Sequence, residues 1–182
     1  GFFFFFSEKG PWVADRIWGW ALHHYTWNAS GGRTNDWFKG KSDALKFDNE
    51  QYYNILQEAN RMDGLLKEHW RIMGEFDRDR GTKLVVDEWG AWHSPGTEIG
   101  DNYLLSQQVT IRDALVSGLS LDTFIRHADK VAMGNAAQVI NCIHSLFLAY
   151  EDKFVLTPNY HVFEMQMPHM QGQSIRTEFF AD

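Results

Sequence analysis

A carboxylate, Glu88, stands at the end of a short β-branched run, residues 83–87 (KLVVD), and is flanked by Trp89 and Trp92. A carboxylate in such a position can attack the anomeric carbon of a sugar and form a covalent glycosyl–enzyme. Tryptophan suits a sugar site because the C–H faces of sugar rings pack on indole. The alternative is a solvated acidic pair at a strand end, with the Trp side chains filling a core. The sequence thus offers Glu88 as a candidate nucleophile.

The preceding apolar segment, residues 16–25 (RIWGWALHHY), ends in His23, His24 and Tyr25. Because side chains alternate along a strand, His23 and Tyr25 share one face and His24 points the other way. A tyrosine hydroxyl beside Glu88 could hold that carboxylate by a hydrogen bond, and a histidine could bind a sugar hydroxyl. The alternative is that these residues pack at the rim of a sheet.

Zinc is another use for these side chains, because histidine nitrogen and carboxylate oxygen both bind it. The candidate ligands would be His23, His24, His93, Asp87 and Glu88. No HExxH motif or other fixed ligand spacing is present in the sequence. We therefore expect neither a metal nor a cofactor.

Gln138, Asn141 and Cys142 follow the third apolar run, residues 130–133. The two amides could hydrogen-bond sugar hydroxyls or the nucleophile, or they could be capping or surface residues. Cys142 lies in an apolar stretch and is expected to be a buried, inert thiol. The sequence has no Gly-rich phosphate loop and no serine nucleophile elbow.

Strand-like and helix-like patterns alternate along the chain. Strands are expected at residues 16–25, 83–87 and 130–133, and helices at 48–73, 102–127, 138–143 and 157–170. In the first helix, Asp48 and Gln51 form a capping-box pair ahead of apolar residues at i, i+3, i+4 spacing. Pro158 suits the start of the last helix.

This order predicts an α/β fold with parallel strands and right-handed crossovers. The polar residues follow the carboxyl ends of the strands, which is where a (β/α)8 barrel carries its chemistry. A barrel needs eight strand–helix units and typically ~250 residues, whereas 182 residues carry about three. The expectation is therefore a single partial barrel.

Charge and composition limit the partners. Lys and Arg total 17 and Asp and Glu total 24, so the net charge of −7 disfavours nucleic acid and anionic membranes. The run Phe2 to Phe6 is too short for a membrane span and lacks the basic start of a signal peptide. A single cysteine excludes an internal disulfide, so the compartment stays open, with cytoplasm favoured over secretion.

Four stretches, in order, resemble glycoside hydrolase family 51, the α-L-arabinofuranosidases. They are ALHHYTW (21–27), VVDEWGAWH (85–93), HADKVAMGNAAQVIN (127–141) and TPNYHVFEM (157–165). The similarity runs from about residue 18 to the end of the chain. It implies strands 6–8 of the family's catalytic barrel, with residues 173–182 as the possible start of its β-sandwich.

The resemblance also implies roles for particular residues. Glu88 matches the catalytic nucleophile, and His23 and Tyr25 match residues that orient the nucleophile and the sugar. Gln138 matches a residue that contacts the bound furanose. The two tryptophans beside the nucleophile match aromatic positions that contact substrate. The reaction implied is removal of terminal α-L-arabinofuranosyl groups from arabinoxylan or arabinan, with retention. The substrate is then an arabinose-containing oligosaccharide or polysaccharide, and the full-length enzyme could be a homo-oligomer.

The sequence departs from the family pattern in three ways. His24 stands where an amide or aromatic residue is common, and Gly90 stands where Asn is common; either could shift substrate preference. The family's acid/base glutamate, in a Gly-Asn-Glu motif, does not occur here. We expect it upstream of residue 1.

Two alternatives remain beside this hydrolase. The chain could belong to another retaining barrel enzyme, such as an endoglucanase or a xylosidase. It could also be a non-catalytic carbohydrate-binding remnant. A substrate panel separates the first from an arabinofuranosidase, and binding of arabinan without product would favour the second.

Overall fold

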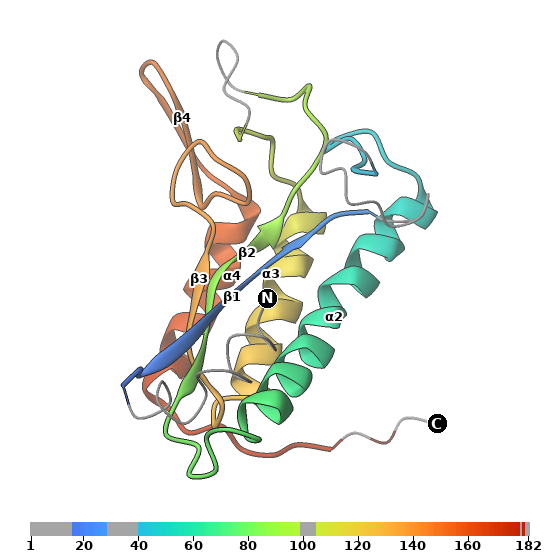
Figure 1. The fold of residues 1–182 in the computed structure, drawn as a ribbon. Helices are drawn as coiled ribbons and strands as arrows, with labels where there is room; N and C mark the ends of the chain where they lie inside the picture. Colours follow the sequence, from blue (N-terminus) through green and yellow to red (C-terminus); the bar gives the residue numbers. More distant parts are fainter. Residues whose placement is uncertain (1–15, 29–39, 99–104, 179, 181–182) are drawn as a thin grey trace.

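The computed structural model describes residues 16–28, 40–98, 105–178 and 180. Its centre is a three-stranded parallel sheet of order β1-β2-β3. These strands and the helices between them are β1 (Gly19–Thr26), α2 (Asn49–Met73), β2 (Lys83–Ala91), α3 (Ile111–Arg126) and β3 (Val131–Ala136). The predicted alternation of parallel strands and helices is confirmed (Figure 1). The Phe2 to Phe6 run lies outside the described residues.

The core lies between the sheet and its helices. From β1 and β2 it takes Leu22, Leu84 and Val86, which are at most 8 % exposed. Met62 and Leu66 of α2 contribute the opposite side. Figure 1 shows α2, α3 and α4 on the same side of the sheet. The face of the sheet that these three helices do not cover is called the open face below.

Helix α2 forms as its sequence predicts. The Asp48 side chain accepts a hydrogen bond from the backbone N–H of Gln51 at 2.8 Å, and the Gln51 side chain accepts one from the N–H of Asp48 at 3.3 Å. This capping box satisfies two of the donors that a helix start leaves open. The helix then ends at Met73 before Gly74.

Helix α3 is shorter than predicted. It was expected from residue 102, but it begins at Ile111, behind its own capping box of Thr110 and Asp113. The preceding residues 106–110 are not helical, and the Gln107 side chain there bonds the backbone of β2 at Ala91 and of His93. A Thr-x-x-Asp pattern marks this start in the sequence and was missed.

The helix expected at residues 138–143 is wrong. After β3 the chain makes bends and a turn, in which Asn141 and His144 have φ of 51° and 57°. Such left-handed backbone cannot continue a right-handed helix. An antiparallel hairpin follows, β4 (Phe147–Tyr150) and β5 (Lys153–Leu156).

The tail helix is confirmed in shortened form. Helix α4 (Pro158–Gln166) has proline in its first turn and passes into a 3-10 turn, η1 (Met167–Gln171). Residues 173–178 form no helix or strand. The expected start of a β-sandwich there stays a prediction.

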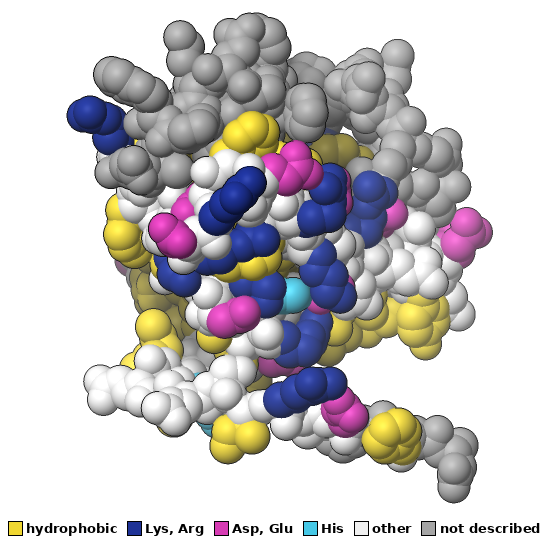
Figure 2. Space-filling view, turned by 60° about the horizontal axis from the view of Figure 1, so that its bottom comes forward, with side chains coloured by type: hydrophobic (Ala, Val, Ile, Leu, Met, Phe, Trp, Pro, Cys, Tyr) yellow, Lys and Arg dark blue, Asp and Glu magenta, His cyan; other side chains and the backbone are white. Residues whose placement is uncertain are grey.

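Lys and Arg side chains gather, with Asp and Glu among them, at the end where α2 finishes and β2 begins (Figure 2). Arg71 pairs with Glu68 and Glu75, at 2.9 and 2.8 Å, and Lys130 pairs with Asp129 at 2.7 Å. Carboxylates within four residues of these cations in the sequence thus offset their charge. No helix in the described part of the chain is long and apolar enough to span a membrane.

Candidate active site

Glu88 reaches the open face of the sheet through an irregularity in β2. Leu22 of β1 pairs with Val86, but the next residue, His23, pairs with Glu88, so Asp87 is an extra residue in the β2 strand. An extra residue reverses which face the following side chains take. Without it, Glu88 would share the core-facing side with Val86.

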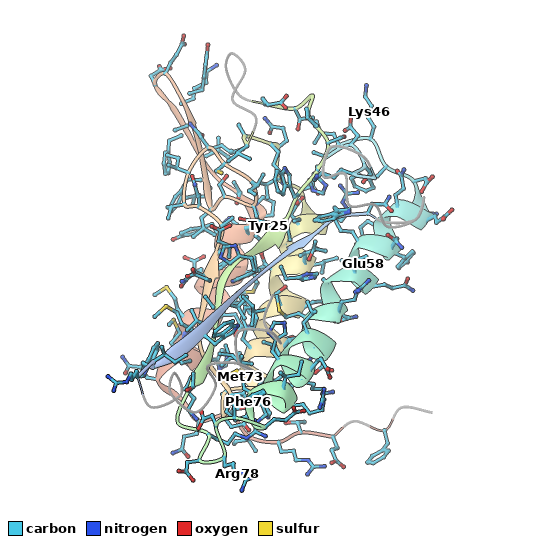
Figure 3. The ribbon with its side chains drawn as sticks, viewed as in Figure 1. Tyr25, Lys46, Glu58, Met73, Phe76 and Arg78 are labelled. Atoms are coloured by element: carbon cyan, nitrogen blue, oxygen red, sulfur yellow. The ribbon has the colours of Figure 1, made fainter. Side chains whose placement is uncertain are left out.

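Tyr25 and His23 of β1 meet Glu88 on this face, as the alternation predicted. The Tyr25 hydroxyl donates to Glu88 Oε2 at 2.6 Å, and His23 Nδ1 lies 3.5 Å from the same oxygen. Figure 3 places Tyr25 well above Met73, the last residue of α2, and Arg78. Because Tyr25 is the next-to-last residue of β1 and Glu88 lies in the second half of β2, this cluster lies toward the carboxyl ends of the strands.

The Tyr25 phenol stays protonated over the whole working range of pH. Burial raises its pKa, and the hydrogen bond to Glu88 and the negative charge of that carboxylate raise it further. Because only the phenol form has an O–H to donate, the contact holds the Glu88 carboxylate in one orientation.

A second carboxylate, Asp87, faces His23 from the other side. His23 Nε2 lies 3.6 Å from Asp87 Oδ2, and the Asn135 side chain of β3 donates to Asp87 Oδ1 at 3.4 Å. Sequence reasoning missed Asn135. Asn135 lies at the carboxyl end of the third strand. The expectation that polar residues at strand ends carry the chemistry, which selected Glu88, could have selected it too.

Trp92 forms an aromatic wall beside this cluster. Its ring meets Tyr25 edge-on, with the centroids 5.2 Å apart. The Lys41 ammonium lies over the Trp92 ring at 4.4 Å and over Trp27 at 5.0 Å from the centroids. Sequence reasoning also missed Lys41, which lies far from Trp92 along the chain and carries no motif.

The expectation that Trp89 binds substrate is wrong. Its side chain is fully buried among the core residues, because the extra residue in β2 turns it to the helix side. The indole stacks on Phe163 at 6.0 Å and meets Phe124 edge-on at 5.4 Å. Trp89 packs the core directly behind Glu88.

The two amides after β3 have different surroundings. Gln138 is exposed, two residues beyond the strand, and makes no hydrogen bond to any residue in the described ranges. Asn141 both donates to and accepts from the backbone of Ala149, at 2.7 and 2.8 Å. Asn141 therefore anchors the hairpin. No hydrogen bond joins Gln138 to Glu88, and its contact with a bound furanose stays a prediction.

The thiol of Cys142 is buried, as expected. Burial and the negative charge of Glu88 raise its pKa, against a hydrogen bond from the Ile143 backbone. A thiol kept protonated in this way is a poor nucleophile.

His93 belongs to a buried network behind the site. Its Nε2 lies 2.7 Å from Asp113, and its Nδ1 lies 3.2 Å from Arg112 Nη2. Arg112 also donates to the carbonyl of Asp43 at 3.1 Å, which ties the segment before α2 to α3. Within the described residues no group of three or more His, Cys, Asp and Glu side chains is placed to hold a metal ion.

His144 holds the end of β2 through a hydrogen bond to its last residue, Ala91. Its Nδ1 accepts from the backbone N–H of Ala91 at 3.0 Å, so the neutral ring carries its proton on Nε2, 2.8 Å from Ser117 Oγ. Gly90 lies against this ring with φ of 149°, and a Cβ there would come within 2.6 Å of His144 Cβ. The family's Asn does not fit this backbone position, so Gly90 has a packing role.

Three comparisons relate the chain to known proteins. Residues 87–182 match the family model of the α-L-arabinofuranosidase C-terminal domain. An intracellular exo-α-L-arabinofuranosidase from Bacteroides ovatus is 38 % identical over 162 residues, which are 88 % of this chain and 30 % of that protein.

Solved structures agree in fold. A GH51 arabinofuranosidase from Xanthomonas axonopodis pv. citri superimposes with a TM-score of 0.79 at 33 % identity, over 94 % of this chain and 33 % of that one. An α-L-arabinofuranosidase from Thermotoga maritima, solved with arabinose, gives 0.63 at 23 % identity, over 87 % and 28 %. The chain thus spans about a third of the length of these relatives.

Stability should fall in mild acid because of His144. Burial lowers its pKa from 6.5 to about 4, so the unfolded chain takes up a proton between these values while the folded chain does not. Unfolding in urea should therefore be easier at pH 5 than at pH 7, by about 2 kcal/mol from this residue. His144→Gln should remove that part of the pH dependence. Burial also lowers the pKa of His69, so the comparison is repeated in a His69→Gln background as a control. Parallel pH profiles with and without His144 would contradict the prediction.

Proposed function

Because the chain belongs to the glycoside hydrolase family 51 α-L-arabinofuranosidases and corresponds to their C-terminal region, we propose that it carries the nucleophile of a retaining α-L-arabinofuranosidase, and that this nucleophile is Glu88. The observation that supports this most is the 2.6 Å hydrogen bond from Tyr25 to Glu88 at the carboxyl ends of parallel strands. It holds a half-exposed carboxylate on the open face of the sheet, where a sugar can approach.

The hydrogen bond from Tyr25 to Glu88 selects which of the two carboxylate oxygens attacks. Oε2 accepts from Tyr25 and faces His23, whereas Oε1 accepts no hydrogen bond from the described part of the chain. In the first step Oε1 bonds to the anomeric carbon as the bond to the leaving oxygen breaks. The Tyr25 hydroxyl, which donates a hydrogen bond to Oε2, stabilises the charge on that oxygen and leaves the lone pair of Oε1 free to attack.

A second carboxyl group completes this mechanism. It protonates the leaving oxygen and then deprotonates the water that releases the sugar, from about 5–5.5 Å away. We assign it to the family's acid/base glutamate, on a strand outside this sequence. The three parallel strands are then strands 6–8 of a (β/α)8 barrel, and residues 173–182 lead toward the β-sandwich.

The substrate proposed is a terminal α-L-arabinofuranosyl group on arabinoxylan or arabinan. His23, Trp92 and Gln138 are the residues of this chain that we propose to contact it. An endoglucanase or a xylosidase remains the alternative, and a substrate panel in the intact protein separates them. The Bacteroides relative is named intracellular, which supports the cytoplasm as the location.

Replacing Glu88 by Gln should abolish turnover while sparing the fold, because the amide keeps the shape but lacks the nucleophilic oxygen. Hydrolysis of a nitrophenyl α-L-arabinofuranoside by the intact protein measures this, with circular dichroism as the check on folding. Glu75→Gln, at the far end of α2, is the matched control and should keep full activity. Activity of the Glu88→Gln variant close to that of the unaltered protein would contradict the assignment of Glu88 as the nucleophile.

Tyr25→Phe should lower kcat roughly 10- to 100-fold, the equivalent of the 1.5–3 kcal/mol typical of a hydrogen bond to a charged group. The ring and its contact with Trp92 remain, so KM should change less than kcat. Tyr53→Phe, on the exposed side of α2, controls for loss of a phenol. A kcat equal to that of the unaltered protein would show that the Tyr25–Glu88 hydrogen bond does not contribute.

A further inference from the structure

His23 lies between two carboxylates that are neighbours in the sequence. Its Nδ1 faces Glu88 Oε2 at 3.5 Å and its Nε2 faces Asp87 Oδ2 at 3.6 Å. Two consecutive side chains of a regular strand point to opposite faces. Here both reach the same ring because Asp87 is the extra residue of β2.

Asp87 is itself fixed from the third strand. Asn135 donates to its Oδ1 at 3.4 Å, which leaves Oδ2 directed at His23. The series Asn135, Asp87, His23 and Glu88 thus crosses the sheet from β3 through β2 to β1 and back to β2. Each contact is longer than an ideal hydrogen bond, as is common in ligand-free sites that tighten around substrate.

The chemistry of imidazole determines which of the two carboxylates accepts the hydrogen of the His23 ring. A neutral ring has one N–H donor and one lone pair, and a lone pair that faces a carboxylate is repelled. Of the two carboxylates, Glu88 already has the Tyr25 hydroxyl as a donor on the oxygen nearest to His23. The Asp87 oxygen that faces His23 has no other donor among the described residues, so it is the better acceptor for the ring proton.

Resting on the proposed function of Glu88, we propose that Asp87 is a positioning residue that acts through His23. It accepts the hydrogen on Nε2, fixes the plane of the ring, and so determines that Nδ1 is the nitrogen next to the nucleophile. Nδ1 is then an acceptor for a sugar hydroxyl, and it does not donate a second hydrogen bond that would weaken Glu88 as a nucleophile. Removing Asp87 frees the ring to turn about its Cβ–Cγ bond.

The direct test is nitrogen-15 NMR of the histidine rings in the intact protein, with His23→Gln to assign the signal. The unaltered protein should show His23 protonated on Nε2. Asp87→Ala should shift the signal toward Nδ1 protonation or an average of both tautomers, whereas Asp87→Asn should keep it, because the amide oxygen still accepts. A tautomer that is the same with and without Asp87 would overturn the proposal. This measurement needs no activity, so it stands apart from the assignment of Glu88.

Kinetics test the consequence for the reaction. Asp87→Ala should lower kcat on a nitrophenyl α-L-arabinofuranoside roughly 10-fold, below the ~10²-fold that a 1 Å misplacement of a reacting group can cause. Asp87→Asn should restore most of the loss. Asp79→Ala, in the exposed turn before β2, is the matched control and should leave kcat unchanged. A shifted tautomer with unchanged kcat would overturn the positioning role, and an active Glu88→Gln protein would overturn the proposed function alone.

Discussion

The extra residue at Asp87 in β2 is the constraint on which the rest of the site depends. Strand side chains alternate between faces, so every position after Val86 is set by whether one residue is inserted there. With the insertion, Trp89 turns into the core against Phe124 and Phe163, and Glu88 turns out toward Tyr25 and His23. A regular strand would bury the carboxylate against apolar helices at a large desolvation cost. Packing of the indole and exposure of the carboxylate are thus two results of one backbone irregularity.

The surroundings hold this irregularity in place. β1 and β3 pair with β2 on both sides, and both pairings shift register at this point. Beyond it, the end of β2 is tied down by His144 at Ala91 and by Gln107 at His93 and Ala91. Hydrogen bonds are directional, so these buried contacts define the position of the strand end more closely than apolar packing alone would. Tyr25 then needs only one hydrogen bond to orient Glu88, because both backbones are already placed.

Much of this arrangement could be predicted from the sequence. The features that could not be predicted depend on contacts between segments far apart in the chain. Helix α2 was found with its capping box because propensity, periodicity and cap agree there. The shared face of His23 and Tyr25 followed from strand alternation. Strand alternation could not locate the extra residue at Asp87, because the register of a strand pair depends on both strands. The predicted substrate contact of Trp89 was wrong for that reason, since the extra residue turns its side chain into the core. Residues 138–143 carry an apolar pattern, but the backbone is left-handed at Asn141 and again at His144, directly after this segment. Lys41 and Asn135 join the site through tertiary contacts that no local pattern contains.

The central claim is that β2 presents Glu88, and not the adjacent Asp87, to the sugar. The measurement that tests it most directly is mass spectrometry of the full-length protein, with its acid/base glutamate replaced by Ala, after brief reaction with a nitrophenyl α-L-arabinofuranoside, followed by fragment-ion sequencing of the labelled peptide. A nitrophenolate leaves with little help from an acid, whereas release of the sugar needs the general base, so the covalent intermediate builds up. The account predicts a single pentosyl group on Glu88. A pentosyl group on Asp87 or on any other carboxylate would contradict it.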